Sequence, residues 1–144
     1  MNLILSDFPL PELGQGPDTA VVDLSALNIH HCIGCFGCWV KTPGKCVIRD
    51  DAGKVYPLIA QSDRVIYVSR VKYGSYDSIM KTMLERAIPI QKAFIQLYRG
   101  ETHHMQRAVK DKEAVIIAYG AQSPEEQAVF RKLIERNAYN MRFS

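Results

Sequence analysis

Four short runs of mostly apolar residues alternate along this chain with segments of helical pattern. The two clearest runs are 64–68 (RVIYV) and 113–119 (EAVIIAY), which are almost uninterrupted. Runs of this kind are typical of strands covered on both faces in a parallel sheet. Residues 2–5 and 19–24 are two further strand candidates, the second rich in β-branched residues. The four runs predict an α/β fold built on a parallel sheet.

Three segments between and after these runs predict helices. The first begins at Asp50-Asp51 and has its apolar positions at Val55, Leu58 and Ile59. The second covers 75–86, with Ile79, Met83 and Leu84 on one face. The third begins at a capping box, 123–126 (SPEE), and runs to about Asn137 with Val129, Leu133 and Ile134 inward.

Residues 88–110 show no clear period, and we expect an irregular segment there. Its large apolar side chains, Phe94, Leu97 and Tyr98, are predicted to be partly buried. Prolines at 9, 11 and 17 exclude a long helix between the first two strands.

Length and charge narrow the classes of function. A chain of 144 residues fits a single domain, 1–144. The net charge of +3 comes without a Lys/Arg-rich run, so nucleic-acid binding has no support. No apolar stretch approaches the ~20 residues of a membrane span, and the N-terminus lacks the pattern of a secretory signal. We therefore expect a cytoplasmic protein with reduced cysteines and no membrane partner.

All four cysteines lie within one segment, at Cys32, Cys35, Cys38 and Cys46, in the pattern C-x2-C-x2-C-x7-C. Thiolates that ligate an iron–sulfur cluster commonly lie two residues apart, so a [4Fe–4S] site is one interpretation. A zinc site with His31 as a spare ligand and a redox dithiol are others. In the remaining interpretation the segment only packs as a loop, which the x7 gap favours.

Three stretches carry a resemblance to a known family. They are 32–51, which includes CIGCFGCW, TPGKC and Asp50-Asp51; 73–86, from YGSY to LER; and, more weakly, 100–104 (GETHH). These stretches resemble the NAD(P)H-dependent FMN reductase and iron–sulfur flavoprotein branch of the flavodoxin-like proteins. The resemblance implies a doubly wound parallel sheet, an FMN cofactor and NAD(P)H as electron donor to an unspecified acceptor. The cysteine pattern also occurs in cluster-free relatives, which likewise favours a packing role.

In that family, loops at the carboxyl ends of the strands hold the flavin. The resemblance assigns the flavin contacts to two of these loops, at Arg70, Lys72, Tyr73, Gly74 and Ser75, and at Tyr119 and Gly120. Tyr73 and Gly74 would form an aromatic platform and a point of close approach. The two cations, Arg70 and Lys72, replace the usual proline and aromatic residue and are placed to meet the charge of a nucleotide.

The first flavin loop departs from the family pattern. A Ser/Thr/Gly-rich loop normally opens a helix there, and its N–H groups bind the phosphate. The present chain reads SDFPLP at 6–11 instead. Asp7 and Asp18 would repel a phosphate, and Pro9 and Pro11 supply no N–H group. The phosphate motif is absent.

The sheet is also shorter than in the family, which has five strands in the order 2-1-3-4-5. We predict about four strands here, in the order 2-1-3-4, with 141–144 as the stub of the fifth. Strand 113–119 would then be an unpaired edge, which proteins usually cover. We therefore expect a homo-oligomer, or a partner chain over this strand.

Three functions remain open. The first is an FMN-dependent NAD(P)H oxidoreductase or a diverged relative of one, which the retained Tyr73-Gly74-Ser75 favours. The second is a flavin-free, flavodoxin-like scaffold or interaction subunit. The third is an electron-transfer protein that uses only a [4Fe–4S] cluster at the four cysteines.

Overall fold

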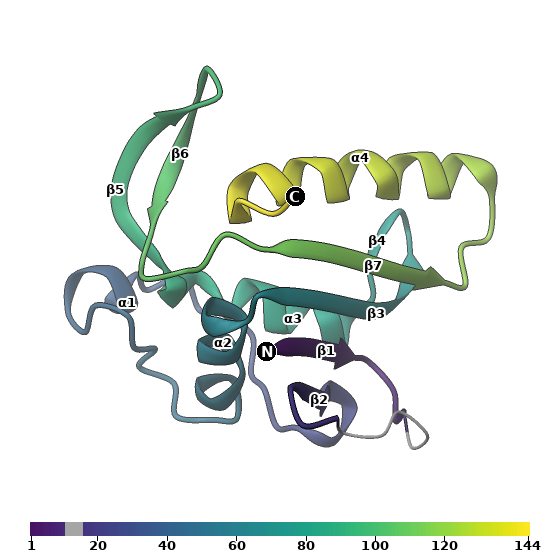
Figure 1. Cartoon of the computed structure of the whole chain (residues 1–144), viewed down its shortest axis with the longest axis horizontal. Helices are drawn as coiled ribbons and strands as arrows, with labels where there is room; N and C mark the ends of the chain where they lie inside the picture. The colour runs from purple at the N-terminus through teal and green to yellow at the C-terminus, as the bar shows by residue number, and fades with distance from the viewer. Residues whose placement is uncertain (11–15) are drawn as a thin grey trace.

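The main element of the fold is a parallel sheet, shown in Figure 1. The structure is a computed structural model that describes residues 1–10 and 16–144. The parallel strands follow the order β2 (Thr19–Asp23), β1 (Asn2–Ser6), β3 (Arg64–Lys72) and β7 (Glu113–Tyr119). The short strand β4 (Ser75–Tyr76) pairs antiparallel with the end of β3. The predicted α/β fold and its strand order 2-1-3-4 are confirmed, with β7 as the fourth parallel strand.

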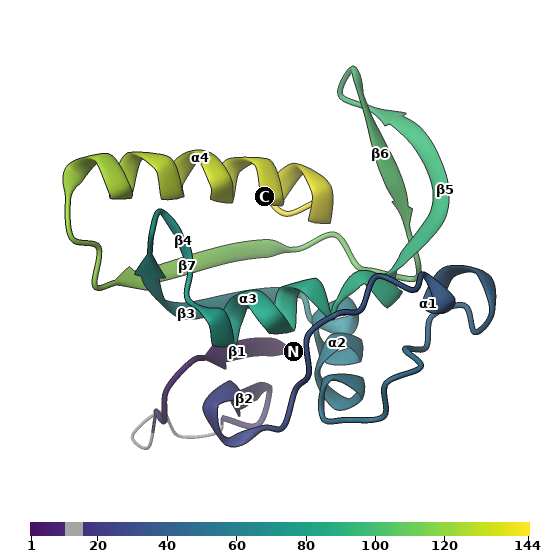
Figure 2. The ribbon, with the colours of Figure 1, turned by 180° about the vertical axis from the view of Figure 1, so that it is seen from behind.

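Three helices supply most of the helical packing against the sheet: α2 (Ala52–Gln61), α3 (Ser78–Glu85) and α4 (Pro124–Met141). Figure 2 shows α3 in front of the sheet. The shorter helices are α1 (Gly37–Val40), inside the cysteine segment, and the 3₁₀ turns η1 (Leu24–Ala26) and η2 (Ile88–Ile90). The predicted capping box starts α4, because the Ser123 hydroxyl accepts a hydrogen bond from the Glu126 N–H at 3.2 Å.

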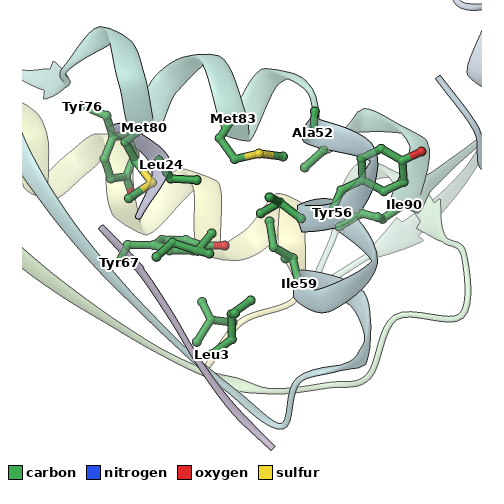
Figure 3. Packing of buried hydrophobic residues seen from close by; sticks show 14 of the residues in the cluster. Leu3, Leu24, Ala52, Tyr56, Ile59, Tyr67, Tyr76, Met80, Met83 and Ile90 are labelled. Atoms are coloured by element: carbon green, nitrogen blue, oxygen red, sulfur yellow. The ribbon is translucent and has the colours of Figure 1, made fainter. Parts of the chain in front are cut away.

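One face of the sheet forms the core with these helices. Leu5 is paired with Tyr67, and Tyr67 with Ile116, so the three side chains lie on the same face. Figure 3 shows part of this cluster, where Tyr67 and Leu3 lie near Ile59 of α2 and Met80 and Met83 of α3.

The opposite face of the sheet carries apolar side chains that do not join this core. Ile66 is paired with Val115, and Val68 with Ile117. Val115 and Ile117 on the edge strand are 37% and 52% exposed. In Figure 1 no helix passes in front of β3 and β7. The described part of the chain therefore leaves this side of β7 open.

On two helices, one of the three predicted inward positions is wrong, while Met83, Leu84, Leu133 and Ile134 do pack at the core as predicted. Ile79 and Val129 were predicted to point inward, but both are exposed. Their neighbours Met80 and Phe130 are buried instead, and the Phe130 ring meets the Tyr76 ring edge-on at 5.0 Å. The α3 helix also begins at Ser78, because the Asp77 carboxylate caps it and residues 75–76 form β4.

The prediction of an irregular segment over 88–110 is wrong. The chain forms a two-stranded hairpin there, from β5 (Gln91–Tyr98) and β6 (Glu101–Gln106), which extends away from the sheet in Figure 1. Its turn is Arg99-Gly100, and both residues have positive φ, as tight hairpin turns require. Because the ribbon extends away from the sheet, Phe94 and Leu97 are exposed rather than partly buried.

The chain end supplies a short remnant of a fifth strand beside β7. Phe143 forms an isolated parallel bridge with Lys112, and the Ala114 N–H donates to the Ser144 carbonyl at 3.0 Å. Beyond these contacts, β3 is the only strand that pairs with β7 in the described residues. Within the same residues, no helix combines the length and apolar character that crossing a membrane requires.

Candidate functional site

The carboxyl ends of β1 and β3 form the natural ligand crevice of this sheet. The chain leaves β1 toward β2 on one side and leaves β3 toward β7 on the other, so the strand order reverses between them. Ligands of open α/β sheets bind at such a reversal point. The residues that follow each strand there decide what the crevice can accept.

Asp7, the residue that follows β1, fills this crevice with its carboxylate. One oxygen accepts hydrogen bonds from the Arg70 N–H at 2.7 Å and the Ser69 hydroxyl at 3.2 Å. The other accepts from the Tyr119 hydroxyl at 2.8 Å. Asp7 is buried, and it connects the ends of β1, β3 and β7.

Three of the predicted flavin contacts gather around Asp7. Burial, followed by the hydrogen bond to Asp7, raises the pKa of Tyr119 to about 12. The Phe8 ring meets the Tyr119 ring edge-on at 5.3 Å. Gly120 has φ of +76°, and a Cβ there would lie 3.2 Å from the Arg70 side chain. Arg70, Tyr119 and Gly120 thus share one site with Asp7.

The other four predicted contacts belong to the tight turn between β3 and β4. Tyr73 and Gly74 both have positive φ, and Lys72 pairs with Ser75 across the turn. The Tyr73 ring is 90% exposed, with the Lys72 ammonium 5.6 Å from its centre. Gly74 is covered by α4, since a Cβ there would lie 2.7 Å from Val129 Cγ1. The close approach made by Gly74 is therefore to a helix.

The described residues of the first loop do not fit a phosphate group. The Asp7 N–H donates to the Val68 carbonyl, and the Phe8 N–H faces the Ser6 hydroxyl. Asp7 adds a buried carboxylate, which repels an anion. The predicted repulsion by Asp18 is wrong, however, because Asp18 lies at the opposite end of β1. Its carbonyl accepts from the Asn2 N–H, and its carboxylate is 3.2 Å from the N-terminal amine. Residues 11–15 of this loop, Pro11 included, lie outside the described residues.

The four cysteines surround a single cavity of about 310 Å³. Two of them, Cys32 and Cys35, are exposed; Cys38 is buried and Cys46 is half-buried. Apolar side chains complete much of the wall, mainly Ile33, Phe36, Val47, Ile48 and Ile88. Burial raises the pKa of the Cys38 thiol, and the nearby Cys46 raises it further because two thiolates would repel each other.

Arg86, at the end of α3, holds both ends of the cysteine segment. Its guanidinium donates to both carboxylate oxygens of Asp50, at 2.7 and 2.9 Å, and to the His30 carbonyl at 2.7 Å. It also lies 3.4 Å from Cys46 Sγ. Arg86 and Asp50 have side chains only 1% and 2% exposed, so this ion pair is fully buried.

The Arg86 Nε atom is buried and has no hydrogen-bond partner among the described residues. Buried N–H groups are seldom left unpaired, so this one is an exception within a guanidinium that otherwise has several partners. Four thiols that line one cavity are the kind of donor set that an iron–sulfur cluster uses.

A single metal ion is not favoured by the same geometry. No three or more His, Cys, Asp or Glu side chains are arranged to hold one ion within 1–10 and 16–144. His31, the spare ligand of the zinc interpretation, faces α3, where its ring nitrogen lies 3.1 Å from the Thr82 hydroxyl. It is absent from the cavity lining.

Sequence reasoning missed the two residues that organise these sites. Asp7 was interpreted only as an obstacle to phosphate, although it connects three strand ends. The sequence indicates Arg86 only as the last residue of a helix within the second stretch of resemblance. Its partner Asp50 lies 36 residues away, and no local pattern indicates such a pairing.

The family match and the individual relatives of this chain point to the same group of flavoproteins. Residues 5–135 match the NADPH-dependent FMN reductase family. An iron-sulfur flavoprotein of Archaeoglobus fulgidus is 38% identical over 84 residues, which cover 58% of this chain and 37% of that protein. An iron-sulfur flavoprotein of Methanocaldococcus jannaschii is 30% identical over 80 residues, 56% of this chain and 40% of that protein. A third, from Clostridioides difficile, is 34% identical over 74 residues, 49% of this chain and 32% of that protein. The chain thus spans less than half the length of these curated relatives.

Proposed function

Because this chain belongs to the NADPH-dependent FMN reductase family, we propose that it is an electron-transfer protein of that family with a [4Fe–4S] cluster at its cysteine cavity. Cys32, Cys35, Cys38 and Cys46 would each supply one thiolate. The observation that carries this proposal is the shared cavity that all four thiols line. The names of the three iron-sulfur flavoprotein relatives support it.

The chain's own residues suit this role in two ways. A bound [4Fe–4S] cluster would supply reversible electron transfer. Apolar side chains line the cavity beside the thiols, and hydrogen bonds and burial are what set the potential of such a centre. The Arg86 guanidinium lies 3.4 Å from Cys46 Sγ, within reach to donate a hydrogen bond to a ligating sulfur.

Substitution of the exposed cysteines tests the proposal. Because Cys32 and Cys35 are exposed, Cys32→Ser and Cys35→Ser leave the hydrophobic core intact. We expect both variants to remain folded by circular dichroism and to lose most of the iron and acid-labile sulfide found in the wild type after anaerobic purification. Val40→Ser is the matched control, since Val40 lies in the same segment, is 69% exposed and does not line the cavity. Equal iron in all four proteins would refute ligation by these cysteines.

A second candidate is an FMN-dependent NAD(P)H oxidoreductase, favoured by the family match, which includes the strand-end crevice. In this case Arg70, Tyr119 and Gly120 would contact the flavin, with Lys72, Tyr73, Gly74 and Ser75 on the neighbouring turn. The described part of the phosphate loop does not fit FMN, so binding would be weak. Each lost charge-assisted hydrogen bond costs ~1.5–3 kcal/mol.

Removing the Asp7 charge tests this second candidate. If FMN enters the crevice, Asp7→Asn should tighten its binding about tenfold, as measured by quenching of flavin fluorescence. Asp18→Asn removes the same charge at the opposite end of β1 and should change nothing. No binding by any of the three proteins would leave the flavin-free alternatives, either a cluster protein or a scaffold.

The proposed function also suggests a cellular compartment and a partner for this protein. Reduced cysteines and thiolate ligands suit the cytoplasm. The open side of β7 suits a homo-oligomer, in which a second copy covers Val115, Ile117 and Tyr119. A different partner chain over this strand is the alternative.

A further inference from the structure

One hydrogen bond distinguishes a single thiol of the cysteine site from the other three. The Nη2 atom of Arg86 lies 3.4 Å from Cys46 Sγ and donates to it. Among the described residues, no other hydrogen bond to a cysteine sulfur is present. Cys46 is thus the one candidate ligand whose sulfur accepts a hydrogen bond from a charged group.

The guanidinium of Arg86 is held in one orientation. Its Nη1 atom donates to the Asp50 carboxylate and to the His30 carbonyl, both at 2.7 Å. Its Nη2 atom donates to the other Asp50 oxygen at 2.9 Å, beside its contact with Cys46. A planar guanidinium suits such simultaneous contacts, because its N–H groups form a rigid fork. The Arg86 side chain is 1% exposed, so bulk water has little access to these donors.

The charge pair decides which property of Arg86 can act on a cluster. The Asp50 carboxylate offsets the positive charge of the guanidinium, so the buried pair is neutral as a whole. A directional N–H···S contact remains at Cys46. Hydrogen bonds to the ligand sulfurs are among the factors that set the reduction potential of an iron–sulfur cluster.

The direction of this effect follows from charge. Reduction adds one electron, and therefore one negative charge, to a cluster and its thiolates, with no bond made or broken. A donor at a ligand sulfur stabilises the more negative form, because hydrogen bonds strengthen as the acceptor gains charge. The donor therefore raises the reduction potential.

We propose that Arg86 raises the reduction potential of the cluster by donating its Nη2 hydrogen bond to Cys46. This inference rests on the proposed function, since it needs a cluster that Cys46 ligates. Arg86 is a positioning residue, which acts through Cys46, and Asp50 fixes its orientation.

Arg86→Lys tests the proposal. Lysine keeps the positive charge but has a single nitrogen, so it cannot contact Asp50, His30 and Cys46 together. We expect the variant to retain iron and sulfide and to show a lower midpoint potential in an anaerobic titration with dithionite. A loss of about tenfold in the equilibrium constant of reduction corresponds to ~59 mV for this one-electron couple. Arg49→Lys is the matched control and should leave the potential unchanged, because Arg49 is exposed and does not line the cavity.

A second measurement uses the wild type and does not depend on how the variant folds. The protein is prepared with arginine that carries ¹⁵N in its guanidinium group and is reduced with dithionite. Electron spin-echo spectroscopy should then show coupling of the cluster spin to ¹⁵N through the contact of Arg86 with Cys46. If Arg86→Lys loses the cluster, this coupling alone decides the proposal.

The outcomes separate the role of Arg86 from the presence of a cluster. A wild type without iron and sulfide would refute the cluster, and this inference with it. A wild type that holds the cluster but shows no ¹⁵N coupling would overturn only the role of Arg86. Equal potentials in the wild type and Arg86→Lys, or an equal fall in Arg49→Lys, would do the same.

Discussion

At the scale of single residues, the buried pair of Arg86 and Asp50 contributes most to the shape of the cysteine site. Arg86 donates to backbone carbonyls on both sides of the cysteines, at His30 and at Ile48. Asp50 accepts further hydrogen bonds from the N–H groups of His30 and Ala52. The loop that carries four potential ligands is thus fixed by a charge pair that is not itself a ligand.

Loss of one partner of this pair should be strongly destabilising. Arg86→Met leaves the Asp50 carboxylate buried and unpaired, which costs ~3–5 kcal/mol in the free energy of unfolding. Lys54→Met is the control, because it breaks the exposed pair of Lys54 and Asp51 and should have no measurable effect. Urea denaturation of both variants measures the difference. Equal midpoints would contradict a structural role for Arg86.

The same pair makes stability dependent on pH. Burial alone would raise the pKa of Asp50, but the hydrogen bonds from Arg86 and from the His30 and Ala52 N–H groups outweigh it and lower the pKa to about 2. Because the folded-state pKa is lowered, the contribution is complete above the ordinary value of 3.8 and is lost as the pH falls through about 2. The stability gap between the wild type and Asp50→Asn should therefore narrow over this window in acid denaturation series. A gap that stays constant there would show that Asp50 is not the titrating group.

At the scale of elements, the tight turn between β3 and β4 fixes the position of α4. Gly74 donates its N–H to the Glu126 carboxylate at 3.1 Å, and the same carboxylate accepts from the Gln122 N–H. Val129 covers the glycine directly. The motif Tyr73-Gly74-Ser75, which the sequence associates with a flavin, thus has a structural role in joining the sheet to a helix.

Alanine substitutions at two glycines distinguish the cost of a steric clash from the cost of backbone strain. Gly74 and Gly100 both have positive φ, but a Cβ at Gly100 meets nothing within 4 Å. Gly100→Ala should therefore cost only the backbone strain, ~1–2 kcal/mol, whereas Gly74→Ala should cost more because of Val129. Thermal unfolding measures both, and Val129→Ala should rescue part of the Gly74→Ala loss. Equal losses without rescue would argue against the contact with α4.

At the scale of the whole molecule, the sequence predicts the sheet and its order, but not how its surfaces are used. Apolar runs predict β1, β2, β3 and β7, because a buried strand is visible as a short run of neighbouring apolar residues in the sequence. The β5–β6 hairpin was not predicted, because Arg99-Gly100 is a weak turn signal. A two-stranded ribbon that extends away from the sheet also lacks the alternation of apolar and polar residues that marks a strand with one buried face. The crevice contacts of Asp7 and the pairing of Arg86 with Asp50 join distant segments, so no local pattern contains them.

The open side of β7 predicts self-association. We expect light scattering to give at least twice the chain mass of 16.3 kDa. Ile117→Lys places a charge on the open face and should produce monomers. Val40→Lys is the control, since Val40 is similarly exposed but lies on α1. A monomeric wild type, or an Ile117→Lys variant of unchanged mass, would contradict an interface at this face.

The absorption spectrum of anaerobically purified protein, with iron and sulfide analysis of the same sample, decides whether the four cysteines hold a cluster. We expect a broad shoulder near ~400 nm and about four iron and four sulfide per chain. Bleaching on reduction with dithionite should accompany it. A colourless protein without iron, or peaks near ~375 and ~450 nm from flavin alone, would contradict the cluster and return the function to the crevice or to a scaffold.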